Sequence, residues 1–143
     1  MRIVGGRPRA RVVVLDGSRS APVDAEHFEA TTQAADVVEQ IHELAASISN
    51  RVLGLRPDRV MVQRADYFKI ASNAEGPRTR LLAEGAIASA VRAKAPDTRC
   101  LVGRDVAIEA GVTKDALKAE AANVIAGDDY LDATCAALAI LDP

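Results

Sequence analysis

The chain has 143 residues, of which 49% are hydrophobic and 27% charged, a balance typical of a globular domain and not of a disordered segment. Its net charge of −2 gives no electrostatic argument for nucleic acid as a partner of the whole molecule, and no apolar run reaches the length of a membrane span. Residues 1–143 are therefore expected to form a single cytoplasmic domain. Cys100 and Cys135 lack metal-ligand spacing and stand in apolar runs, so both are interpreted as buried, reduced thiols.

The first thirty residues favour three antiparallel strands. Residues 2–4 form a short apolar segment, and Pro8 is expected to interrupt its pairing because proline has no backbone N–H. The β-branched run 11–15 predicts a second strand that stops at a turn over 16–18, where Asp, Gly and Ser follow one another. A weaker third strand is expected over 23–31.

An amphipathic helix is expected next, because apolar residues recur at three- and four-residue spacing from Ala34 to Ile48. Thr31 or Thr32 is placed to cap this helix, which ends near Gly54. The short apolar segment 59–63 follows the helix directly and is predicted to be a buried parallel strand.

Helices and strands alternate in the second half of the chain. The expected elements are a loop or broken helix at 65–78, a helix through 81–91 that breaks at Pro96, a strand at 99–102, a helix at 104–110, a helix capped by Thr113, and a last helix at 128–141. Three antiparallel strands followed by this alternation predict an α/β fold with a mixed five-stranded sheet (three antiparallel then two parallel strands) and helices on both faces.

Charged residues in two regions are candidates for a site. Asp129 and Asp132 stand three residues apart at the expected start of the last helix, so their carboxylates would share one face near the positive end of the helix dipole. Arginines crowd the first nineteen residues, and Arg7 and Arg9 are candidates for phosphate contacts. A solvated strand edge, where charge discourages aggregation, explains the arginines equally well. Glu84 and Glu109 are interpreted as helix-surface charges.

The segment Asp129-Tyr-Leu-Asp132 with its alanine-rich continuation resembles the closing segment of the RuvC-type Holliday-junction resolvases, a family of the ribonuclease-H-like superfamily. Three further pieces resemble the family in the same order: the turn 56–58 before the central strand, Asn73-Ala74 beyond Phe68, and the turn at 103–105. The resemblance covers about the last hundred residues. It implies a ribonuclease-H-like domain, a homodimer, branched DNA as partner and a Mg²⁺- or Mn²⁺-dependent endonuclease.

The resemblance also implies four carboxylates around the metal, and here the sequence departs from the family. Gln63 stands where the family has Glu, and a neutral carboxamide is a much poorer Mg²⁺ ligand. The first-strand position falls on Gly5 or Gly6. Asp16 could supply that carboxylate in another register, but too little chain would then remain for two more strands, so Asp16 is favoured as a turn residue.

Phe68 and Asn73 follow the central strand. The resemblance implies that an aromatic side chain in this loop lies at the DNA surface, where its ring can stack on an unstacked base. An aromatic anchor packed on the core is an equally good interpretation of Phe68.

Three hypotheses for the function follow. The first is a RuvC-like nucleic-acid-binding protein of DNA recombination or repair whose nuclease activity is weak or lost, with Asp129 and Asp132 as residual ligands for Mg²⁺ that is bound loosely or not at all. The second is an active structure-specific endonuclease that uses Asp16, Asp129 and Asp132, with Gln63 as a neutral ligand. The third is a non-catalytic protein-interaction domain that retains only the fold.

Overall fold

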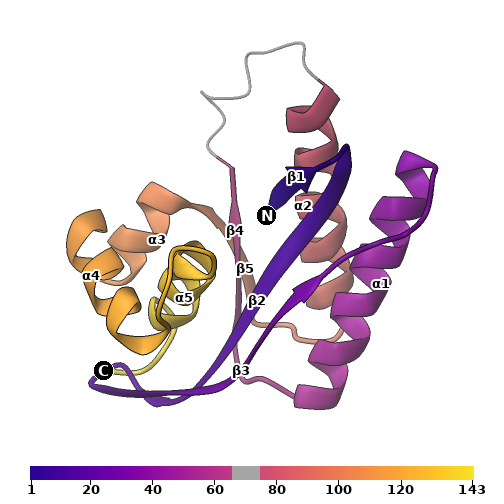
Figure 1. The fold of residues 1–143 in the computed structure, drawn as a ribbon. Coiled ribbons are helices and arrows are strands. Elements are labelled where there is room, and N and C mark those ends of the chain that lie inside the picture. The colour runs from indigo at the N-terminus through magenta and orange to yellow at the C-terminus, as the bar shows by residue number, and fades with distance from the viewer. Residues whose placement is uncertain (66–74) are drawn as a thin grey trace.

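The structure is a computed structural model and describes residues 1–65 and 75–143. The elements in chain order are β1 (Arg2–Val4), β2 (Arg7–Ser18), β3 (Ala21–Ala30), α1 (Val37–Leu55), β4 (Val60–Arg64), α2 (Glu75–Arg92), β5 (Thr98–Val102), α3 (Gly103–Glu109), α4 (Lys114–Val124) and α5 (Leu131–Leu138). Helices α1 and α2 lie on one side of the strands and α3, α4 and α5 on the other (Figure 1), as predicted. None of the helices in the described ranges is both long and apolar enough to cross a membrane.

The strands form two sheets. β2 pairs antiparallel with β1 and with β3, and β4 pairs parallel with β5. Three antiparallel strands and two parallel ones are therefore present as predicted. The prediction of one continuous five-stranded sheet is wrong, because within the described residues no hydrogen-bonded ladder joins β2 to β4, and a cavity lined by both strands lies between them.

β2 is longer than predicted at both ends. Pro8 lies within it, opposite Ile3, and does not end the strand. Only β1 pairs with β2 at this end, so a residue without an N–H is tolerated there. The predicted turn at 16–18 is also wrong, since Ser18 pairs with Ala21 and the turn follows one residue later. Gly17 permits this continuation, because it has a φ of +86° and a Cβ would lie 2.6 Å from the Ala21 carbonyl oxygen.

Helix α1 begins later than predicted. Its N-cap is Asp36, whose carboxylate accepts hydrogen bonds from the N–H groups of Val38 and Glu39, and not Thr31 or Thr32. The Thr32 hydroxyl instead donates to Glu43 and accepts from the Ala34 N–H. A carboxylate at the residue directly before a helix competes well for the free N–H groups of the first turn, and the spacing of apolar residues alone does not reveal that choice.

The capping residue of α4 is Thr113, as predicted, and its hydroxyl accepts a hydrogen bond from the Ala116 N–H. The last helix is shorter than predicted. α5 begins at Leu131 and ends at Leu138 instead of spanning 128–141. Gly127, which has a φ of +96°, lies between α4 and α5 and lets the chain turn before α5 begins.

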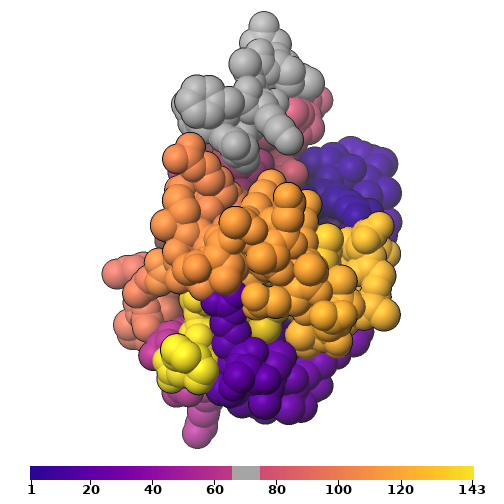
Figure 2. All heavy atoms as spheres, turned by 90° about the vertical axis from the view of Figure 1, so that its left-hand side faces the viewer, coloured from indigo at the N-terminus to yellow at the C-terminus, as the bar shows by residue number. Residues whose placement is uncertain are grey.

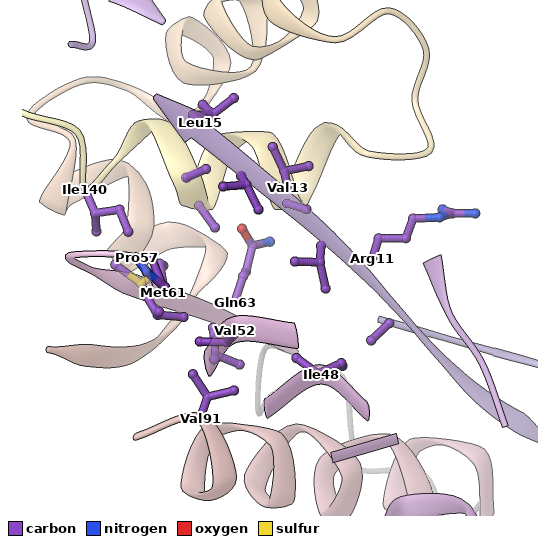
Figure 3. A pocket seen from close by; sticks show the side chains of 18 of the residues that line it. Arg11, Val13, Leu15, Ile48, Val52, Pro57, Met61, Gln63, Val91 and Ile140 are labelled. Atoms are coloured by element: carbon purple, nitrogen blue, oxygen red, sulfur yellow. The ribbon is translucent and has the colours of Figure 1, made fainter. Parts of the chain in front are cut away.

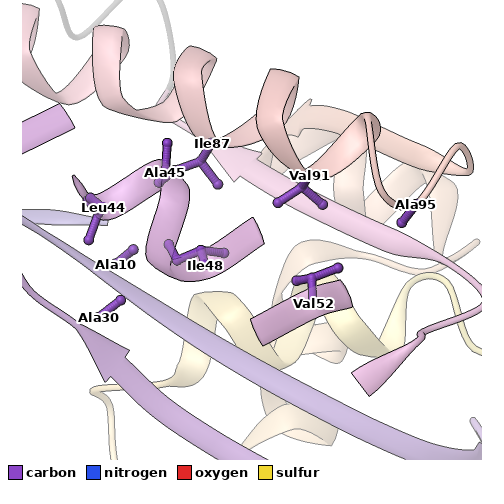
Figure 4. Close-up of a cluster of buried hydrophobic side chains, with 9 residues drawn as sticks. All are labelled: Ala10, Ala30, Leu44, Ala45, Ile48, Val52, Ile87, Val91 and Ala95. Carbon is purple, nitrogen blue, oxygen red and sulfur yellow. The ribbon is translucent and has the colours of Figure 1, made fainter. Parts of the chain in front are cut away.

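Two apolar clusters hold the helices to the two faces of the strands. The first lies between the β2–β3 hairpin, α1 and α2 (Figure 4), with Leu44 at its centre. The second joins α3, α4 and α5 and includes Leu117 and Leu138. Neighbouring residues of β4 divide between them, with Val60 packed on the first cluster and Met61 on the second. This alternation is the two-residue period of a strand covered on both faces.

The two thiols differ in burial. Cys135 is buried, as predicted, whereas Cys100 is exposed, so the prediction for Cys100 is wrong. β5 carries Cys100 in a sheet of two strands, and no third strand covers it on the far edge within the described residues. We expect a maleimide to label Cys100 in the native protein and Cys135 only after unfolding.

Burial raises the pKa of the Cys135 thiol from 9.0 to about 11. Between about pH 9 and pH 11 the Cys135 thiol therefore keeps its proton in the folded state and loses it in the unfolded state. The free energy of unfolding falls as the pH rises through this range. We expect the free energy of unfolding to fall by up to about 2 kcal/mol more in the native sequence than in Cys135→Ala between about pH 9 and pH 11. Urea denaturation of both proteins across that range measures the difference, and equal pH dependence would contradict it.

Candidate functional site

A cavity of about 570 Å³ is lined by several of the predicted site residues. It lies between β2 and β4, with α1 and α2 on one side and α5 on the other (Figure 3). Its lining includes Gln63, Asp129, Asp132, Asp16 and Arg9, which were all selected from the sequence. Aliphatic side chains from α1, α2 and α5 make up much of the lining, and charged residues from several elements contribute the rest.

Gln63 is the fourth residue of β4, and its carboxamide points into the cavity (Figure 3). Gly103, at the start of α3, leaves room for this side chain, since a Cβ at that position would lie 3.2 Å from the Gln63 Nε2 atom. The carboxamide offers one neutral oxygen acceptor and one NH₂ donor group. It can orient a polar ligand but brings no negative charge to the cavity.

Asp129 lies outside the helix on which it was predicted. Tyr130 is the N-cap of α5, so Asp129 belongs to the preceding turn, while Asp132 lies in the first turn of the helix. The prediction that both carboxylates share one helix face is therefore wrong. The cause is local: the chain between Gly127 and Tyr130 is not helical, so the three-residue spacing has no helical geometry behind it.

The Asp129 carboxylate is held by two arginines. Its Oδ1 atom lies 3.1 Å from a guanidinium nitrogen of Arg2 and 3.1 Å from one of Arg11. Arg11 also donates to the Asp129 backbone carbonyl at 2.7 Å. Two cations therefore contact one carboxylate, and they compete directly with any metal ion for its oxygen.

Arg11 is the more constrained of these two cations, and it was not among the site residues predicted from the sequence. Its side chain is only 16% exposed and donates from Nε to Glu29 at 3.2 Å. The guanidinium carbon also lies 5.6 Å from the centre of the Tyr130 ring. Arg11 thus ties β2 and β3 to the turn before α5. Its contact with Asp129 joins residues 118 positions apart, so no local pattern could have indicated it.

Asp132 and Asp16, the other two carboxylates of the endonuclease hypothesis, take no part in the ion pairs of Asp129 with Arg2 and Arg11. Asp132 is exposed and forms no ion pair with any described residue. Asp16 lies on β2, five residues beyond Arg11, which corresponds to about 16 Å along the strand. The structure therefore does not bring Asp16 next to Asp129, and the register that would make Asp16 a shared metal ligand has no support.

Glu84, which was predicted to lie on the surface, is a buried carboxylate in the lining of the cavity. Glu84 of α2 is 2% exposed and accepts hydrogen bonds from the Arg80 Nε at 2.7 Å and the Ala65 N–H at 2.9 Å. The interpretation of Glu84 as a helix-surface charge is wrong, because this face of α2 packs against the end of β4. The one available signal was the four-residue spacing of Arg80 and Glu84.

The α-amino group of Met1 is a further titratable group at the cavity. Burial lowers the pKa of this group below its ordinary value of 8.0, and the charge of Arg80 adds to the effect. Glu84 and Asp132 act in the opposite direction, which places the amine between the acidic and basic groups of the site.

The other arginines near the N-terminus divide into exposed and structural ones. Arg7 is exposed and donates to Gln33, and Arg9 is paired with Glu29 but has a side chain 42% exposed. Arg19 instead clamps the tip of the β2–β3 hairpin to α4 through Glu120, and Figure 2 shows this hairpin tip (purple) against the helical layer (orange). Phe68 and Asn73, also predicted for the site, lie outside the described residues.

The residues around the cavity do not fit the divalent-metal cage that the resemblance implies. Within residues 1–65 and 75–143, no three acidic, histidine or cysteine side chains come close enough together to hold a metal ion. Gln63 is neutral, and the Asp129 oxygen is paired with two guanidinium groups. A Mg²⁺ ion prefers several anionic or neutral oxygens in an octahedral arrangement, and these side chains present a nearly neutralised set instead.

The chain matches no protein-family model and no curated protein. Its structure is similar to that of RuvC from Thermus thermophilus, with a TM-score of 0.66 and 14% sequence identity, over 92% of this chain and 84% of that one. The fold is RuvC-like. This likeness covers nearly the whole chain. At this identity it establishes the fold and does not extend to the chemistry of the site.

Proposed function

We propose that this protein is a RuvC-like nucleic-acid-binding protein that contacts branched DNA as a homodimer without cutting it. The observation that carries the proposal is the pairing of the Asp129 carboxylate with Arg2 and Arg11. By resemblance to the resolvases, this carboxylate would be a metal ligand. Here guanidinium groups occupy its oxygen, and the neutral Gln63 replaces a second expected carboxylate.

Exposed arginine side chains on the first two strands support contact with the phosphates of a nucleic acid. Arg2 and Arg9 have side chains that are 55% and 42% exposed, so each can reach a phosphate while keeping its present partner. Arg7 on the same hairpin is exposed as well. Guanidinium groups bind phosphate oxygens through paired N–H donors, and such contacts contribute most of the affinity in non-specific DNA binding.

The proposal predicts that no Mg²⁺-dependent cleavage occurs on a synthetic four-way DNA junction. A cleavage assay with Mg²⁺ and Mn²⁺, using the native sequence and Asp132→Asn, measures this directly. Asp115→Asn, on the exposed first turn of α4, is the matched control. Metal-dependent cutting that Asp132→Asn abolishes and Asp115→Asn preserves would overturn the proposal in favour of an active endonuclease.

Binding itself is tested by gel shift of the same junction at increasing salt. We expect affinity to fall steeply with salt, because phosphate contacts release counterions. The double variant Arg7→Gln/Arg9→Gln should bind more weakly and with a slope smaller by about 2. Lys94→Gln, an exposed site after α2, is the control for the loss of positive charge. Absence of any salt-sensitive binding would favour a protein-interaction domain that retains only the fold.

A further inference from the structure

Two strand edges face the same cavity, and neither pairs there with another strand of residues 1–65 or 75–143. Consecutive residues of β2 (9–17) and the neighbouring residues 59–63 at β4 line it. Successive side chains of a strand point to opposite faces, so an unbroken row of residues lines a cavity only where the strand presents its edge. β2 uses its other edge for β3, and β4 uses its other edge for β5.

The cavity continues the line of β1. β1 pairs with the first part of β2, with Arg2 opposite Arg9, so a strand extended back from Met1 would run alongside Arg11 and the residues after it. Met1 itself lines the cavity, and Figure 1 shows the N-terminus in the region between β2 and β4. β1 occupies the position beside β2 at one end, and no other described strand occupies it along the remainder of β2.

Apolar side chains form both walls of this slot, which we define as the cavity between β2 and β4. The wall from α1 and α2 consists of branched aliphatic residues: Ile48, Val52, Ile87 and Val91. The wall from α5 consists of small residues, Ala133, Ala136 and Ala137, and Ile140 beyond the helix continues it. A strand placed in the slot would be covered on both faces, as the central strand of an α/β sheet is, and would need apolar side chains on both.

We propose that the slot binds an extended apolar peptide segment of a partner protein by β-strand addition, in line with β1 and antiparallel to β2. Such a segment would pair with the free edges of both β2 and β4 and join the two sheets into one. A small apolar ligand would fill the volume but would leave the N–H and C=O groups of both edges unpaired, which is unfavourable in a buried site. A peptide backbone satisfies both edges at once, and main-chain hydrogen bonds are the source of affinity in strand addition.

The first test uses a synthetic peptide with a core of about five valine and alanine residues, near the length of β4, flanked by lysines for solubility. Amide hydrogen exchange of the protein is measured with and without it. We expect alternate amides within 11–17 and 60–64 to exchange fast in the free protein and to slow by about tenfold or more when the peptide is bound. A peptide of the same composition with two central prolines should give no protection, because proline cannot donate to a ladder.

The second test places the strand in the same chain. The β1 register directs a strand-forming extension of about six residues before Met1 into the slot. The melting temperature of the protein with this extension is compared with that of the protein with a proline-containing extension. We expect a rise of several degrees for the first extension only. Ala133→Phe, which fills the slot from α5, should abolish the peptide's protection, whereas Ala122→Phe on the exposed surface of α4 should not.

Two results would overturn the proposal. One is strong protection of both edges in the free protein, which would mean that β2 and β4 pair directly in solution. The other is an equal effect of the strand-forming and proline-containing sequences in both experiments. Neither result bears on DNA binding or cleavage, so this proposal and the proposed function can fail independently.

Discussion

Replacing Glu84 by alanine is expected to lower the free energy of unfolding by about 3 kcal/mol, because it breaks a buried ion pair. The carboxylate is 2% exposed and accepts from Arg80 and from the Ala65 N–H. Its removal leaves the end of β4 without a hydrogen-bond acceptor and Arg80 without its counterion. Since the Arg80 side chain is 33% exposed, water can solvate its guanidinium group after Glu84 is removed. The expected loss in free energy of unfolding is therefore at the lower end of the range for broken buried ion pairs.

Urea denaturation of Glu84→Ala, Glu84→Gln and Glu109→Ala measures this effect. Glu84→Gln keeps an acceptor for the Ala65 N–H and should lose less than Glu84→Ala. Glu109 pairs with Arg99 on the surface, and its replacement should change stability by less than about 1 kcal/mol. If Glu84→Ala lowered the free energy of unfolding no more than Glu109→Ala, the Glu84 carboxylate would be solvated, which would contradict its buried position.

Replacing Arg11 by methionine is expected to lower the free energy of unfolding by about 2 kcal/mol, because several charge-assisted hydrogen bonds disappear together. Methionine keeps most of the aliphatic volume of the side chain, so the loss reports chiefly on the contacts with Glu29 and Asp129. Arg7→Met, at an exposed position on the same strand, is the matched control and should have little effect. Equal destabilisation by the two variants would show that Arg11 does not organise the turn before α5.

Variants of Arg11 also test whether arginines exclude metal ions from the Asp129 carboxylate. The native protein should show no change in melting temperature when Mg²⁺ is added. In the triple variant Arg2→Gln/Arg11→Met/Gln63→Glu, the Asp129 carboxylate loses both guanidinium partners and a further carboxylate enters the cavity. We expect Mg²⁺ to raise the melting temperature of that variant, since a ligand that binds only the folded state stabilises it. Mg²⁺-dependent stabilisation of the native protein would contradict the neutralised site.

The elements of the candidate site could be predicted to different degrees. Gln63, Asp129 and Asp132 were selected through the family resemblance, and the structure places all three around one cavity. The arginine contacts to Asp129 could not be predicted, because they join the first strands to a turn more than a hundred residues away. Glu84 was assigned to the surface because charge alone indicates exposure, and only the packing of α2 against the end of β4 buries it.

Local order in this chain follows from short-range patterns. Apolar spacing predicts α1, α2 and α4, β-branched runs predict β2 and β4, and the hydroxyl of Thr113 predicts the start of α4, because each depends on residues within a few positions of one another. Whether β2 and β4 join into one sheet depends on the distance between segments that are far apart in sequence. The same holds for the neutralisation of Asp129. Both are set by how the helices pack on the two faces of the strands, and only the tertiary structure contains that information.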